Sequence, residues 1–575
     1  MARLSRLLSA VCLGIAATAA VAAVAVATEY APVHRTPLHR GESASNARVI
    51  VKFKERASIL SASASTTASA AAAGGPQKAA VLGGRLGLAL TDGRILGERT
   101  QVMEARGMSS AALAASIGAD SDVEWAEVDQ RRFIQAAPVN DPLYPDGLTA
   151  ATPASGQWYL HAPGIDASGH DVLSSINIEP AWAITHGSTA IVIGDVDTGI
   201  TQHPDLDSKM LPGYDFVSDI PTANDNSARD GDPSDPGDWV TATENSTKSG
   251  AFFGCNDNGT GAAVPANSSW HGTQTAGILG AATNNGAGMA GTAYTVPVIA
   301  ARALGKCGGY DSDIIAAAEW AGGMAVSGAP ANAHPARVIN MSLGGSGTCS
   351  QAYVDALTAL RDKGVVVVAA AGNDEGLAVS TPANCHPAAG GDQTPIVIAV
   401  AGLRHAGTKV GFSDIGTDVT IAAPGGNCIN TSSSEPCLYP ILTTINSGTP
   451  TPVAGGGPYT NSLGEVRLGT SFSTPLVEGT VALMLSADPS LTNADVVRIL
   501  KATARPFPTV SDTSPQPPVC TVPVSGGTTT QDECICTTST CGAGMLDAGA
   551  AVARVWAEAG NTGVGPVADI TSTSS

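Results

Sequence analysis

Five apolar runs in the central part of the chain constrain its fold more than any other feature. They lack the polar alternation of a half-exposed strand, so each is expected to be a strand buried on both faces. The runs lie at 190–199, 297–304, 336–343, 364–373 and 395–402.

Segments with helical patterning separate these runs, at 272–282, 312–325 and 353–364. Strands that alternate with helices form a mostly parallel sheet, which the helices cover on both faces. The expected class is therefore α/β, with three layers. In such folds ligands bind beyond the carboxyl ends of the strands.

The first residues have the features of a secretory signal peptide. Arg3 and Arg6 precede an apolar stretch that ends with the small-x-small sequence Ala25-Val26-Ala27. We therefore expect residues 1–27 to be a signal peptide, the protein to be secreted, and no membrane anchor to remain after cleavage. Cys12 lies within this stretch and is a poor candidate for lipid attachment.

Ten cysteines follow the signal segment. An even number in an exported chain indicates disulfides, and Cys428 with Cys437 is the expected local pair. The other pairings cannot be derived from spacing. Zinc is disfavoured because Cys534 and Cys536 lack a two-residue spacer and no histidine pair lies nearby.

A small α/β unit is expected between residues 28 and 137. Strands are predicted at 48–53 and 123–129, a helix at 109–119, and a low-complexity stretch lies at 61–75. The Pro- and Asp-rich segment 138–146 marks a boundary. The main domain is expected at 138–558, followed by a short tail at 559–575.

Charge divides the chain unevenly. Residues 1–137 have a net charge of +4, whereas residues 138–575 hold 15 Lys and Arg against 39 Asp and Glu, a net charge of −24. A body this acidic repels phosphate backbones, which argues against a nucleic-acid partner. Peptides and cations remain as candidate ligands.

Three residues in these segments have side chains suited to nucleophilic catalysis. Asp197 follows the first apolar run, His271 precedes a helical segment, and Ser471 begins another. Each alone is more typical of a turn or a helix cap. Together they have the order acid, base and nucleophile of one known class of hydrolase. Asp195 is the alternative acid.

The sequence around these residues resembles the subtilisin-like serine protease family. The matching segments are "DTGI" with "HPDL", "HGTQTAG" and "GTSFSTPLVEG", with "SLGG" (342–345) and "AAGN" (370–373) between them in the family order. The resemblance implies a subtilisin-like three-layer fold. It also implies a triad in which Asp197 orients His271, His271 acts as base, and Ser471 attacks, with Asn373 in the oxyanion hole.

The resemblance also implies a broad-specificity endopeptidase that holds an extended peptide between two glycine-rich edges. The long insertion between Asp197 and His271 and the cysteines resemble the larger, disulfide-bearing secreted bacterial members. The implied substrate-binding residues are Gly308, Gly309, Ser342, Leu343, Gly344, Gly345 and Ser380.

Two structural calcium sites are predicted. Segment 215–239 holds seven aspartates, and carboxylates spaced this closely can surround Ca²⁺, although most acidic runs are only solvated loops. The expected ligands there are Asp225, Asp230, Asp232, Asp235 and Asp238. A second site is implied by the family resemblance alone, with the ligands Asp141, Asp205 and Asn285.

Residues 28–137 resemble the family's inhibitory pro-region, preceding the main domain as a ferredoxin-like unit. This implies a zymogen that cleaves itself near Gln135 to Ala137, and we expect a monomer. Two other functions were weighed. An inactive peptide- or calcium-binding relative has no support, because every chemical position is filled. An esterase on an α/β-hydrolase fold lacks Gly-x-Ser-x-Gly and has another residue order.

Overall fold

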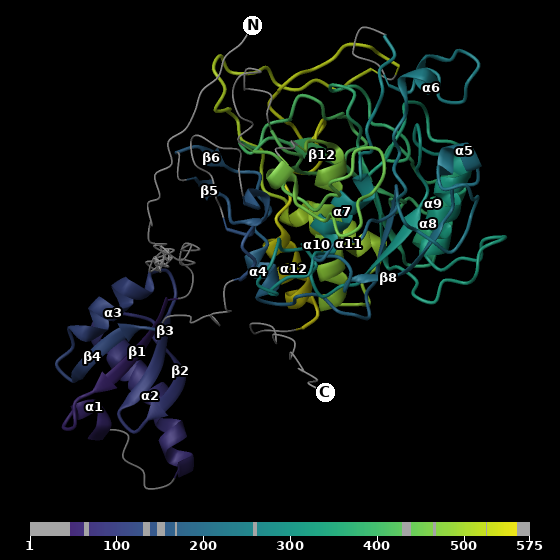
Figure 1. Cartoon of the computed structure of the whole chain (residues 1–575). Helices are drawn as coiled ribbons and strands as arrows, with labels where there is room; N and C mark the ends of the chain where they lie inside the picture. The colour runs from purple at the N-terminus through teal and green to yellow at the C-terminus, as the bar shows by residue number, and fades with distance from the viewer. Residues whose placement is uncertain are drawn as a thin grey trace, which may run out of the picture. The chain divides into compact units, whose positions relative to one another are not determined.

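A computed structural model describes residues 47–61, 68–129, 139–145, 156–166, 169–256, 262–427, 439–463, 467–524 and 526–560. The chain divides into two compact units, Met1–Phe133 and Ile134–Ser575, and each is described by itself (Figure 1). The predicted signal segment, the predicted cleavage region, the pair Cys428 and Cys437, and all but the first two residues of the tail lie outside the described residues.

The first unit is a four-stranded antiparallel sheet with the strand order β2-β3-β1-β4. Alternate residues of β1 are buried, among them Val49, Val51 and Phe53, so one face of the sheet packs on a core. With helices after β1 and β3, this order is the predicted ferredoxin-like arrangement. The elements are β1 (Ala47–Phe53), α1 (Ser58–Ser61), α2 (Ala68–Leu86), β2 (Thr91–Gly97), β3 (Thr100–Ala105), α3 (Ser110–Gly118) and β4 (Val123–Val128).

Helix α2 begins at Ala68, inside the low-complexity stretch 61–75. Alanine is the strongest helix former, which explains why a stretch of low complexity continues as a helix.

The second unit is built on a seven-stranded parallel sheet with the order β13-β12-β11-β10-β7-β9-β8. All five apolar runs form strands of this sheet, and β8 and β13 complete it. The strands are β7 (Ile193–Asp197), β8 (Met210–Asp215), β9 (Val298–Arg302), β10 (Val338–Met341), β11 (Val366–Ala370), β12 (Ile398–Leu403) and β13 (Ile421–Pro424).

Helices cover both faces of this sheet, as predicted. Along β11, Val366 and Val368 join the core beneath α10, whereas Val367 and Ala369 join the core beneath α8 and α9. This alternation between two cores explains why β11 carries no polar residue. The longer helices are α7 (His271–Gly280), α8 (Asp311–Ala321), α9 (Gln351–Asp362), α10 (Thr470–Ala487), α11 (Asn493–Thr503) and α12 (Ala548–Glu558).

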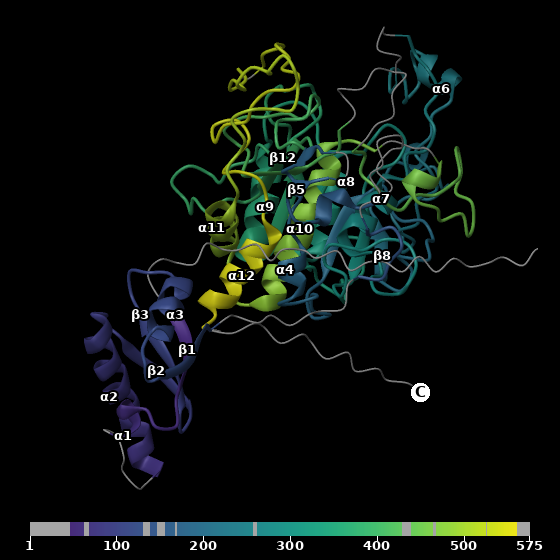
Figure 2. The same cartoon turned by 90° about the vertical axis from the view of Figure 1, so that its left-hand side faces the viewer.

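The remaining elements are short. Helix α4 lies beside α12 in both views (Figures 1 and 2). The short elements are η1 (Trp158–Leu160), β5 (Gly164–Ile165), β6 (Asp171–Val172), α4 (Glu179–Trp182), α5 (Ile220–Ala223), α6 (Ala242–Ser246) and η2 (Thr460–Leu463). Within the described residues, no helix combines the length and the apolar character needed to cross a membrane.

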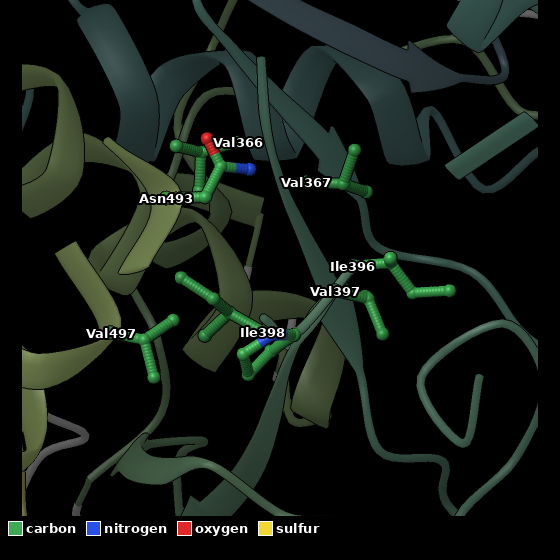
Figure 3. A pocket seen from close by; sticks show the side chains of 8 residues that line it. Val366, Val367, Ile396, Val397, Ile398, Asn493 and Val497 are labelled. Carbon is green, nitrogen blue, oxygen red and sulfur yellow. The ribbon is translucent and has the colours of Figure 1, made fainter. Parts of the chain in front are cut away.

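A crevice between α11 and the amino-terminal ends of β11 and β12 is packing rather than a ligand site (Figure 3). Its lining is apolar except for Asn493, whose amide donates to the Val365 carbonyl (2.8 Å). It has no room for a water molecule.

Four disulfides lie in the described part of the second unit, in agreement with the prediction that the cysteines are oxidised. They are Cys255–Cys307, Cys349–Cys385, Cys520–Cys534 and Cys536–Cys541. The sulfurs of Cys520, Cys536 and Cys541 lie close enough to hold a metal, but each is already bonded to a second sulfur and is not a free thiolate ligand.

Candidate active site

Asp197 and His271 meet where β7 leaves the sheet and α7 begins. The His271 Nδ1 lies 2.8 Å from each Asp197 carboxyl oxygen. A carboxylate only accepts hydrogen bonds, so Nδ1 carries the proton and Nε2 is left as the basic nitrogen. Gly272 makes this approach possible, since a Cβ there would lie 2.2 Å from the Gly199 carbonyl oxygen.

The start of α7 is held in an unusual backbone conformation. Trp270, the residue before His271, has φ of 56°, a region that bulky residues rarely adopt. Its side chain is buried, and its indole N–H donates to the Gly448 carbonyl (2.8 Å). Strain of this kind is retained where the surrounding structure fixes it, and it is common at functional sites.

The hydroxyls that begin α10 tie the helix to the ends of three strands. The Thr470 N–H donates to the Asn373 side-chain oxygen after β11 (2.9 Å), the Ser471 hydroxyl donates to the Ser342 carbonyl after β10 (3.1 Å), and the Ser473 hydroxyl donates to the Pro424 carbonyl on β13 (3.1 Å). The hydroxyl-rich start therefore fixes the helix at the carboxyl edge of the sheet.

His271 and Ser471 line the same cleft, which has a volume of about 570 Å³. In this structure the Ser471 hydroxyl is bonded to Ser342, and no hydrogen bond joins it to His271 among the described residues. Serine side chains occupy three staggered rotamers about χ1, and catalytic hydrogen bonds are often long in unliganded enzymes.

The electrostatic surroundings of His271 stabilise its protonated form. Burial of the imidazole lowers its pKa, but the facing Asp197 carboxylate outweighs this, and the pKa of His271 is raised above its ordinary value. Asp195 and Asp238 contribute in the same direction at longer range.

Asp195, the alternative acid, does not contact His271. Its carboxylate accepts from the Thr275 hydroxyl and from the Asn340 side-chain amide, both at 2.8 Å. Burial, with the neighbouring Asp197 charge, raises the pKa of Asp195. The two aspartates of β7 thus lie in different layers, and only Asp197 reaches the imidazole.

Asn373 follows β11 at the predicted position. Its side-chain oxygen accepts from the backbone N–H and the hydroxyl of Thr470 (2.9 and 3.0 Å). A backbone N–H can only donate, so this contact fixes which end of the Asn373 amide is the oxygen. The Nδ2 group makes no hydrogen bond within the described residues. The side chain is exposed, which leaves this donor available to a ligand.

The predicted peptide-binding edges line the cleft, with one exception. Gly308 and Gly309 lie on one side and residues 342–345 on the other. Ser380 is buried behind Gly344, and its neighbour Thr381 takes the lining position. The prediction that Ser380 lines the cleft is therefore wrong. Ser380 is buried and supports the lining, and the next residue, Thr381, contacts the cleft.

The predicted ligands Asp141, Asp205 and Asn285 come together. Asn285 donates through its backbone to Asp141 (3.1 Å) and through its amide to Asp205 (3.1 Å). Both carboxylates are 1% exposed. Burial, and to a smaller extent the Asp205 charge, raises the pKa of Asp141. Two buried carboxylates and a carboxamide are donors of the kind that a hard cation such as Ca²⁺ takes, and in this structure the Asn285 side-chain oxygen accepts from the Ala287 N–H (2.8 Å).

The five aspartates of segment 215–239 that were predicted to bind calcium do not fit one ion. No three of their carboxylates converge. Asp225 pairs with Arg302 (2.9 Å), Asp235 accepts from the Thr198 hydroxyl (2.7 Å), and Asp238 accepts from Ser269. Asp230 and Asp232 each accept a backbone N–H two residues ahead. Local turns and a buried arginine use these charges, so the spacing alone was misleading.

Several residues of the cleft were not identified from the sequence. Leu304, Asp311, Ile314 and Tyr353 line it, and the Tyr353 hydroxyl donates to Asp311 (3.0 Å). Asp238 also lines it, although its sequence context suggested calcium. The acidic and apolar residues near Gly308 carry no motif that marks them as cleft residues.

Comparisons with known proteins agree with this geometry. Residues 188–534 match the model of the subtilase family, and the chain belongs to that family. It is 41% identical over 443 residues to an extracellular protease of Xanthomonas campestris pv. campestris, which covers 76% of this chain and 61% of the relative. It is 36% identical over 398 residues to an extracellular basic protease of Dichelobacter nodosus, covering 68% of this chain and 56% of the relative.

A solved protease structure from Pseudoalteromonas arctica PAMC 21717 is 37% identical, with a TM-score of 0.55, and the match covers 73% of this chain and all of that one. The chain thus spans little more than half of the length of the curated relatives named above.

Proposed function

We propose that the protein is a secreted serine endopeptidase with broad specificity. The observation that carries the proposal is the pair of the buried Asp197 and the half-buried His271, since His271 lines the same cleft as Ser471. A serine hydroxyl is a weak nucleophile near neutral pH and needs such a base. The naming of two relatives as extracellular proteases supports both the activity and the location.

In the proposed mechanism, rotation about χ1 brings the Ser471 hydroxyl from Ser342 to the Nε2 of His271. His271 accepts the proton as the serine oxygen attacks the scissile carbonyl carbon, and it then donates the proton to the leaving amine. Asp197 keeps the proton on Nδ1 and stabilises the imidazolium.

Negative charge then develops on the substrate carbonyl oxygen. The Nδ2 of Asn373 and the backbone N–H of Ser471 are the proposed donors. Thr470 fixes the Asn373 amide before substrate binds, so the donor needs little reorganisation during the reaction.

We also propose that residues 28–137 form an inhibitory pro-region that the enzyme removes from itself. A large parallel sheet joins strands far apart in sequence and folds slowly, so a preceding unit that assists folding is useful. The first unit's ferredoxin-like sheet supports this role, as does the small positive charge of residues 28–137 (13 Lys and Arg against 11 Asp and Glu), which is opposite in sign to that of residues 138–575.

The purified secreted protein should clear casein, and a serine-directed inhibitor should stop the clearing. Ser471→Ala should reduce kcat by about a millionfold and should remain uncut, whereas the wild type should lose the mass of the pro-region. The matched control is Ser473→Ala, since Ser473 begins the same helix but bonds to Pro424. Clearing that survives Ser471→Ala would remove the nucleophile assignment, and no clearing by wild type would favour an inactive relative.

We further propose structural calcium held by Asp141, Asp205 and Asn285. A bound ion would neutralise two buried carboxylates and stabilise the loop after α7. Calcium at 100 times its Kd should stabilise the folded state by about 2.7 kcal/mol, measured as a higher Tm than in EDTA. Asp205→Asn should remove most of this shift, and Asp232→Asn should retain it. Equal shifts in both variants would contradict the site.

A further inference from the structure

The charged groups of the cleft are arranged asymmetrically. Its lining includes two carboxylates, Asp238 and Asp311, and no lysine or arginine. Neither aspartate has an ion-pair partner within the described residues. Lys306, next to the lining residue Gly305, is held away from the cleft by Glu244 (2.9 Å) and the Trp239 ring (3.8 Å). The cleft therefore carries uncompensated negative charge.

Asp238 is fixed beside the catalytic histidine. Its two carboxyl oxygens accept from the backbone N–H and the hydroxyl of Ser269, at 2.6 and 2.8 Å. Ser269 lies two residues before His271, and its hydroxyl accepts from the His271 N–H (3.3 Å). Asp238 is also among the carboxylates that raise the pKa of His271, after the larger effect of Asp197.

An extended peptide presents successive side chains to opposite sides. We place the side chain of the residue before the cut on one side of the bound strand, so the preceding side chain points to the other side. Of the charged residues that line the cleft, Asp238 is the one tied through Ser269 to His271, next to the attacked carbonyl, and Leu304 supplies an apolar lining residue.

We propose that Asp238 selects peptide substrates with a lysine or arginine at the position immediately before the residue whose carbonyl is attacked. This inference rests on the proposed endopeptidase function and gives it a substrate preference. The aliphatic stem of such a side chain would pack on Leu304, and its charge would lie beside Asp238. The net charge of −24 on residues 138–575 would also attract cationic substrates at long range.

The test uses three internally quenched fluorescent peptides. They differ only at the position immediately before the residue whose carbonyl is attacked, which is lysine, alanine or glutamate. For the processed wild-type enzyme we expect kcat/KM for the lysine peptide to exceed that for the alanine peptide about tenfold, the effect of a partly desolvated charge pair of roughly 1.4 kcal/mol. The glutamate peptide should be slowest.

Asp238→Asn, which keeps the shape and one acceptor for Ser269, should bring the lysine-to-alanine ratio close to one. Asp355→Asn removes the same charge from the exposed face of α9, outside the cleft, and should keep the wild-type ratio. A salt titration of the wild type needs no variant: raising the ionic strength from about 0.05 M to 1 M should also reduce the ratio, because the screening length falls to about 3 Å.

Equal cleavage of the lysine and alanine peptides by wild type at low salt would overturn the preference and leave the proposed function intact. A ratio that Asp355→Asn lowers as much as Asp238→Asn would also overturn it, since the effect would then come from net charge. Cleavage of no peptide and no casein would instead overturn the proposed function.

Discussion

The carboxyl edge of the sheet and the layer directly beneath it use the same three elements differently. On β7, α7 and α10 the edge carries Asp197, His271 and Ser471. One step deeper, the same elements carry Asp195, Thr275 and Glu478. At the edge, His271 and Ser471 line the cleft and Asp197 bonds to His271. The deeper residues are buried in the core.

A polar side chain that is buried away from the cleft cannot contact a substrate, and its effect is on the stability of the fold. Asp195 is satisfied by Thr275 and Asn340, and it holds β7, α7 and β10 together. Glu478 lies seven residues after Ser471, on nearly the same face of α10, and is 0% exposed. Neither of its carboxyl oxygens has a hydrogen-bond partner in the described part of the chain. Chemical type alone thus does not distinguish a catalytic residue from a buried one.

The largest expected contrast lies between the two aspartates of β7. Asp197→Asn should lower kcat by about 10⁴, because the asparagine favours the wrong histidine tautomer. It should also move the acid limb of the pH–rate profile to lower pH, since the carboxylate that raises the pKa of His271 is gone. Asp195→Asn should lower kcat less than tenfold and should instead lower the Tm.

This contrast is measured by pH-resolved steady-state kinetics and thermal unfolding on both variants. If Asp195→Asn proved the more damaging to kcat, the separation into a catalytic edge and a structural layer would be wrong.

A second contrast concerns two asparagines at the ends of neighbouring strands. Asn373→Ala removes the exposed donor after β11 and should lower kcat by about 10² to 10³ with little change in KM. Asn340→Ala removes a buried amide that bonds to Asp195 and Ser342, and should destabilise the fold by about 1–3 kcal/mol. Kinetics and chemical denaturation separate the two, and matching kinetic losses would contradict the oxyanion role.

The last contrast is at Glu478 and concerns stability, with no large change expected in activity. Burial, and to a lesser degree the charge of Asp195, raises the pKa of Glu478 well above its ordinary value of 4.5. Between that value and the raised pKa, the folded state holds a proton that the unfolded state releases, so stability falls as pH rises. The loss should approach about 1.4 kcal/mol per pH unit in this range.

Glu478→Gln cannot ionise and should escape this loss. Its Tm should be close to that of wild type near pH 4 and higher at pH 7 and above, with kcat little changed. Parallel Tm curves for the two proteins across this range would show that Glu478 does not titrate as described.

The sequence predicted much of this fold because the signals were local. Unbroken apolar runs such as 364–373 and 395–402 mark strands buried on both faces, and the segments between them carry helical patterning. The strands β8 and β13 were missed, since "MLPGYD" includes a proline and a glycine and "IAAP" is only four residues long. Both depend on neighbouring strands rather than on their own pattern.

The sequence by itself determined the class of fold, the order of Asp197, His271 and Ser471, and the family, because these depend on periodicity and on short motifs. Only the tertiary structure decided that Asp195 bonds to Thr275 and Asn340, that the acidic loop does not form one cation site, and that Asp238 faces the cleft. The physical reason is that these outcomes depend on which side chains from distant segments come within a few ångströms of one another. The separation of two residues along the chain does not determine their distance in the folded protein.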